Sequence, residues 1–93
     1  MKLMKETEPK DIRYALNTNR IDIISDIYLS ENLYYFYIIY SNTRVSFQSS
    51  ESSTLDEIRE LLFTKLNSYN YIYITTDFLA NLSGEVKILI ENI

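Results

Sequence analysis

An unbroken run of eight apolar or aromatic residues, Leu33 to Tyr40, is the strongest constraint on what this chain can fold into. The run is too short to span a bilayer and has the length of a β-strand. Successive side chains of a strand point to opposite faces of its sheet, so both faces of this strand must be covered or adhesive. Period-two alternation precedes it, from Ile21 to Leu29, and follows it, from Arg44 to Gln48. The sequence therefore predicts three consecutive antiparallel strands.

Short polar segments between these strands predict the turns and the register. Glu31-Asn32 fits a tight turn because Asn tolerates a positive φ, and Ser41-Asn42-Thr43 forms the second turn. With two-residue loops, Ser30 pairs with Leu33 and Ser41 pairs with Arg44. One face then holds the odd positions of the first strand with Tyr34, Phe36, Ile38, Tyr40, Val45 and Phe47. The opposite face holds Asp22, Asp26, Tyr28, Tyr35, Tyr37, Arg44 and Ser46. One extra loop residue would exchange these two sets.

Two segments have the spacing of amphipathic helices. Thr7, Glu8 and Pro9 are typical of a helix start, and they predict a first helix from Glu8 to Asn17 with Ile12, Ala15 and Leu16 buried. Leucine and isoleucine spaced three and four apart predict a second helix over Leu55–Asn67. Its expected cap is Ser53 or Thr54, with Asp56 or Glu57 completing a capping box.

The rest of the chain predicts two further strands. Tyr71 to Thr75 forms one, and Glu85 to Glu91 forms the other with Val86, Ile88 and Ile90 on one face. Residues 76–84 fit either a short helix capped by Thr76 and Asp77 or a hairpin closed at Ser83-Gly84. The expected fold is one α+β domain, residues 1–93. It has a single antiparallel sheet of four to five strands and two helices packed mainly on one face, in the order helix-strand-strand-strand-helix-strand-strand.

Composition excludes most catalytic chemistry. The 93 residues contain no His or Cys, so there is no imidazole base, no thiolate nucleophile and no zinc site built from those ligands. A single glycine is insufficient for a phosphate-binding loop. We therefore expect a non-catalytic protein without cofactor or metal. The alternative is a metal-dependent nuclease, because the element order resembles the restriction-endonuclease-like fold and Asp77 precedes Glu85 and Lys87. We favour the simpler explanation of these three residues, an exposed strand face of alternating charge.

Charge and the chain start suggest the compartment and the partner. The segment from Met1 has no apolar stretch of signal-peptide length, so we expect a cytoplasmic protein without membrane contact. The element order also resembles the double-stranded RNA-binding domain. However, the second predicted helix of this chain begins with acidic residues, whereas the corresponding helix of that domain begins with basic residues that contact phosphates. The net charge of the chain is −4. We therefore expect no direct binding to nucleic acid.

Two groups of residues are candidates for a binding site. Five of the nine tyrosines fall between Tyr28 and Tyr40, and tyrosine is enriched at protein interfaces. Tyr35 and Tyr37 form the candidate recognition face, although these tyrosines also fit the edge of a core. The acidic candidates are Glu51, Asp56, Glu57 and Glu60. They form either a ridge that mimics phosphates or a set of residues that complements the helix dipole.

In size, acidity and organisation the chain resembles the small anti-CRISPR proteins of phages that infect low-GC bacteria. The stretch from Val45 to Ile58, VSFQSSESSTLDEI, is similar to the last strand, acidic serine-rich connector and helix start of one type II-A inhibitor group. The resemblance implies acidic residues that occupy the DNA-motif-reading cleft of a CRISPR effector nuclease. The frequent Ile, Tyr and Asn also suit an AT-rich genome.

These observations predict a protein-binding inhibitor from a phage or mobile element that acts on a host protein such as a defence nuclease. The alternative is a small interaction module, such as an antitoxin, an immunity protein or a dimeric subunit. Leu33–Tyr40 motivates this alternative, because an exposed strand of that composition recruits another chain, including a second copy.

Overall fold

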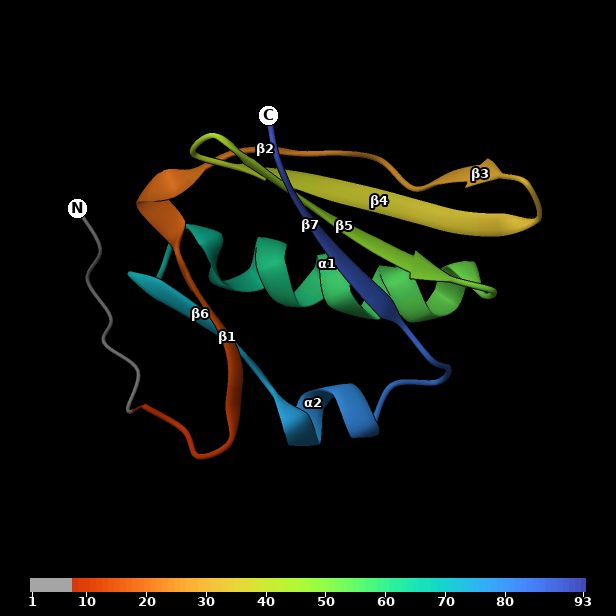
Figure 1. Ribbon diagram of the computed structural model, residues 1–93. Helices are drawn as coiled ribbons and strands as arrows, with labels where there is room; N and C mark the ends of the chain where they lie inside the picture. Colours follow the sequence, from red (N-terminus) through yellow and green to blue (C-terminus); the bar gives the residue numbers. More distant parts are fainter. Residues whose placement is uncertain (1–7) are drawn as a thin grey trace.

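The computed structural model describes residues 8–93, which form two antiparallel sheets and two helices (Figure 1). The elements in chain order are β1 (Ile12–Asn17), the 3-10 turn η1 (Thr18–Arg20), β2 (Ile21–Ile24), β3 (Tyr28–Ser30), β4 (Leu33–Tyr40), β5 (Thr43–Ser49), α1 (Ser52–Leu66), β6 (Tyr71–Thr75), α2 (Thr76–Ala80) and β7 (Lys87–Asn92). The larger sheet has the order β2-β4-β5-β7, and β3 also pairs with β4. The smaller sheet pairs β1 with β6.

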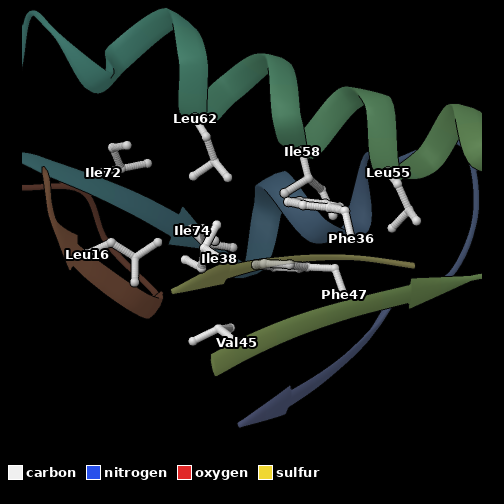
Figure 2. Close-up of a cluster of buried hydrophobic side chains, with 10 residues drawn as sticks. All are labelled: Leu16, Phe36, Ile38, Val45, Phe47, Leu55, Ile58, Leu62, Ile72 and Ile74. Carbon is white, nitrogen blue, oxygen red and sulfur yellow. The ribbon is translucent and has the colours of Figure 1, made fainter. Parts of the chain in front are cut away.

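Helix α1 covers one face of the larger sheet, and the smaller sheet lies on the same side (Figure 1). The core forms between these layers (Figure 2). Phe36 of β4 stacks on Phe47 of β5 with ring centroids 4.7 Å apart, and Ile58 of α1 is completely buried. The remaining core residues are Leu16, Ile38, Val45, Leu55, Leu62, Ile72 and Ile74. The alternate residues of β4 and the apolar residues of α1 at helical spacing therefore pack together in one cluster.

The first turn and its register are as predicted. Glu31 and Asn32 have φ of 51° and 69°, which is the two-residue type I′ geometry, and Ser30 pairs with Leu33. The second turn places Tyr40 opposite Thr43, not Ser41 opposite Arg44. The difference is a slip of two residues, which leaves every side chain of both strands on its predicted face.

The predicted helix over residues 8–17 is wrong, because Ile12–Asn17 is strand β1. Its apolar residues fit both periods: Ile12, Ala15 and Leu16 share a helix stripe, and Ile12, Tyr14 and Leu16 share a strand face. Pairing with β6, far along the sequence, decides in favour of the strand. The expected cap residue Thr7 lies outside the described residues. The single sheet is likewise corrected to two sheets.

The predicted first strand of the meander is interrupted. The register shifts between Ile21 and Ile23, so Ile24 lies opposite Ile38. The predicted position of Ile23 on the face of Phe36 and Ile38 is therefore wrong, because Ile23 lies opposite Ile39 on the other face. Beyond Ile24 the chain leaves the ladder before β3 begins, and Ser25 bridges this gap. Its backbone N–H donates to the Tyr37 carbonyl and its hydroxyl accepts from the Tyr37 N–H, both at 2.8 Å. The side chain of Ser25 thus replaces a missing backbone acceptor.

The second half of the chain follows the prediction with small shifts. Helix α1 begins earlier than expected, at Ser52, and the capping box is absent because Glu51 occupies the N-cap without a side-chain hydrogen bond. Residues 76–84 contain the short helix α2, capped by Thr75, whose hydroxyl accepts from the Phe78 N–H at 3.0 Å. In β7, Ile88 and Ile90 face the core side, as predicted, opposite Phe47 and Val45.

Candidate protein-binding surface

The face of the larger sheet that points away from α1 is called the open face here, because no element within residues 8–93 packs on it (Figure 1). Cross-strand pairing places its residues in rows from β2 and β3 to β7. They are Ile23, Tyr28, Ser30, Leu33, Tyr35, Tyr37, Ile39, Arg44, Ser46, Gln48, Lys87, Leu89 and Glu91. The face thus combines aromatic, aliphatic and a few charged side chains.

Aromatic contacts organise the open face around β4. Tyr28 stacks on Tyr35 with ring centroids 5.6 Å apart and an angle of 17° between the planes. Tyr28 remains 45% exposed, so the outer side of the stack meets solvent. Tyr37 lies two residues along β4 from Tyr35, opposite Ser46 of β5. Both sequence-predicted tyrosines therefore share one face with Tyr28, as the register predicts.

Arg44 lies on the open face near the β4–β5 turn, between Ile39 and Glu91 in the cross-strand register. Its guanidinium carbon is 5.6 Å from the centroid of the Tyr37 ring, an arrangement that a cation–π attraction stabilises. The Nε of Arg44 is buried and donates to no acceptor in the described part of the chain. The buried Nε is closed to an incoming group, but Arg44 as a whole is only partly buried, so a partner's carboxylate or carbonyl oxygen can accept a strong hydrogen bond from the terminal nitrogens of its guanidinium.

The acidic candidates lie elsewhere, on or beside α1, and only some of them face outward. Glu57 Oε2 accepts from the Ser83 hydroxyl at 2.7 Å and from the Ser83 N–H at 3.0 Å. These two hydrogen bonds lower the pKa of the Glu57 carboxyl, more than its partial desolvation raises it. Glu51 lies beside Gly84: a Cβ built there would be 2.6 Å from Glu51 Oε2. Asp56 and Glu60 are exposed.

The structure brings Tyr35 and Tyr37 together but places Asp56 and Glu60 away from them. Helix α1 packs its buried residues, such as Ile58, against the core face of the sheet. Asp56 and Glu60 lie on the outer side of this helix, next to the half-exposed ring of Phe63. The tyrosines and these carboxylates therefore face opposite sides of the molecule, and one flat partner surface cannot contact both.

Two hollows separate β1 from β7. An open cleft of about 550 Å³ is lined by Arg13, Glu85 and Lys87 together with residues of α2. A narrower apolar hollow of about 170 Å³ adjoins it, between β1 and strands β5 and β7. Among residues 8–93, no three Asp or Glu side chains converge as metal ligands.

Sequence reasoning placed Arg44 on the right face but did not select it as a site residue. The signal was present, because Arg and Tyr together mark the anchors of protein interfaces. The buried, unpaired Nε is a property of the packed sheet and has no sequence signature.

Comparisons with known proteins give no relative: neither a protein-family model, nor a curated protein, nor a solved structure matches the chain. Neither helix in residues 8–93 has the length and apolarity required to cross a lipid bilayer. The functional assignment therefore depends on the open face itself.

Proposed function

We propose that this chain is a non-catalytic protein-binding inhibitor that holds its target with the open face of the larger sheet. The observation that carries the proposal is the partly buried Arg44, whose guanidinium is held beside the Tyr37 ring on this face. Tyrosine and arginine are, with tryptophan, the residue types most enriched among interface hot spots. Here these residues lie on a face that no described element covers, so a target can bind to it without unfolding the chain.

The chemistry of the face defines the target surface. The guanidinium of Arg44 selects a carboxylate or carbonyl oxygen, and the ring pair of Tyr28 and Tyr35 selects a flat apolar or aromatic contact. Polar and apolar groups side by side are typical of a protein surface.

The target class is proposed from the sequence. The resemblance of Val45–Ile58 to type II-A anti-CRISPR proteins suggests a CRISPR effector nuclease in a low-GC bacterium, inhibited by a protein of phage or mobile-element origin. In that resemblance the acidic residues occupy a DNA-binding cleft. Here Glu57 is held by Ser83, which leaves Asp56 and Glu60 as the outward carboxylates of α1. Two carboxylates make a short phosphate mimic, so we assign the main contact to the open face.

The test compares three forms of the protein, each affinity-tagged and expressed in a low-GC bacterium that carries a type II-A CRISPR system. They are the native chain, an open-face variant (Tyr37→Ala with Arg44→Ala) and an α1 variant (Asp56→Asn with Glu60→Gln). The native chain and the α1 variant should retain the effector nuclease and block its DNA cleavage. The open-face variant should do neither.

Two results would count against the proposal, and they differ. If the native chain fails to retain the nuclease, the proposed target is wrong. If the α1 variant loses the nuclease and the open-face variant keeps it, the acidic residues form the site and the open face does not.

A further inference from the structure

Strand β7 is an edge of the larger sheet, since β5 is its one strand partner among the described residues. The Ile93 N–H donates to the Asn42 carbonyl at 3.0 Å, which makes Asn42 and Ile93 a hydrogen-bonded pair. In an antiparallel ladder such pairs alternate. The backbone groups of Ile88, Ile90 and Asn92 therefore point away from β5. They are donors and acceptors available to another strand.

The side chains along this edge are apolar and exposed to an unusual degree. Ile90 is 57% exposed and Ile93 is 65% exposed. Ile88 and Ile90 also line the apolar hollow of about 170 Å³ between β7 and β1. An edge strand that presents isoleucine and free backbone groups together is an attachment site for a further strand.

The sequence of β7 is complementary to itself. When two copies of Lys87-Ile88-Leu89-Ile90-Glu91 are aligned antiparallel about Leu89, Lys87 of each copy lies opposite Glu91 of the other. The same register places Ile88 opposite Ile90 of the second copy, and these are the residues whose backbone groups point outward. Charge pairing thus selects this register, and the outward-pointing backbone groups are compatible with it.

We propose that β7 pairs antiparallel with β7 of a second copy, centred on Leu89, to form a two-fold symmetric dimer with one continuous sheet. Lys87, Leu89 and Glu91 lie on the open face, so two symmetric ion pairs flank the axis there. On the other face, Ile88 and Ile90 of the two copies contact each other and cover the exposed isoleucines. This inference is independent of the proposed target, because the dimer forms from the chain alone.

The test uses charge reversal at the two ends of the strand. In a Lys87→Glu dimer, two carboxylates would face each other at both ends, and in a Glu91→Lys dimer two ammonium groups would do so. Each single variant should weaken dimerisation by about tenfold or more, because two attractive pairs become repulsive. An equimolar mixture of the two variants restores attraction at both ends, so it should form a heterodimer about as stable as the native dimer.

Sedimentation equilibrium at tens of micromolar measures the molecular mass of the native chain, of each variant and of the mixture. Far-UV circular dichroism melts establish that each variant is folded. Asp56→Lys is the matched control, because it reverses one charge on the outer side of α1 and should leave the dimer unchanged. A native chain that stays monomeric at this concentration would overturn the proposal. So would a mixture in which the two folded variants remain monomers. Neither measurement involves the target, so failure here leaves the proposed inhibitor function standing.

Discussion

The guanidinium carbon of Arg44 lies 5.6 Å from the ring centroid of Tyr37, on a sheet face that no described helix covers. The two residues come from neighbouring strands, and cross-strand packing holds the arginine in place before any partner arrives. An arginine that is already ordered loses little side-chain entropy on binding. Because the residue is only partly buried, the terminal nitrogens of its guanidinium can still donate to a partner. This combination distinguishes the open face from an ordinary exposed sheet surface.

Substitutions at two adjacent residues of β4 should differ in their effect on stability, because one residue lies in the core and the other on the open face. Phe36 is completely buried and stacked on Phe47, so Phe36→Ala should lower the free energy of unfolding by about 3–5 kcal/mol. Tyr35 is on the open face, where it stacks on Tyr28, so Tyr35→Ala should cost only about 1 kcal/mol. Urea denaturation followed by tyrosine fluorescence measures both. Equal losses would mean that the open face is part of the core.

Glycine at one position of the first turn should increase the stability of the chain. Glu31 has a φ of 51°, in the left-handed region where a side chain is strained. Glu31→Gly should therefore stabilise the chain by about 0.5–1 kcal/mol. Asn42 in the second turn does not have a positive φ, so Asn42→Gly is the matched control and should not stabilise. Thermal unfolding of both variants provides the comparison, and a stabilised Asn42→Gly with an unstabilised Glu31→Gly would contradict the turn geometry.

Glu57 should contribute a pH-dependent part of the stability. Its hydrogen bonds from Ser83 lower the pKa of the carboxyl below its ordinary value of 4.5 in the folded chain. The folded state then holds this proton less tightly than the unfolded state. The contribution is present above pH 4.5 and is lost as the pH falls through the lowered pKa.

Comparison with Glu57→Gln isolates that contribution, because the amide cannot ionise. The variant should melt at a lower temperature than the native chain at neutral pH, and the difference should shrink as the pH falls below 4.5. Glu60→Gln, at an exposed carboxylate, is the control and should show no such convergence. A difference that widens on acidification would contradict the hydrogen-bonded carboxylate.

The sequence determined β4, β5, the turn before β4 and α1 because their signals are local. Alternation over residues 33–48 and the positive-φ turn at Glu31-Asn32 each act within a few residues. The alternation of the strand also placed Tyr35 and Tyr37 on one face. This prediction holds because the two-residue slip at the second turn does not change the face on which a side chain lies.

Features that depend on distant pairing were not predictable. The segment Ile12–Asn17 has apolar residues at both helix and strand spacing, and only its pairing with β6 makes it a strand. That pairing also divides the sheet in two. The separation of the tyrosines from Asp56 and Glu60 has the same origin, because it depends on which face of the sheet α1 covers.

Hydroxyl-radical footprinting of the complex with the effector nuclease tests the central claim most directly. Tyr28, Phe63 and Tyr71 are 45%, 50% and 44% exposed, so radicals reach each of them in the free chain. They report on the open face, the outer side of α1 and the smaller sheet, respectively. Binding through the open face predicts that oxidation of Tyr28 falls sharply in the complex while Phe63 and Tyr71 react as before. Protection of Phe63 with no change at Tyr28 would contradict it.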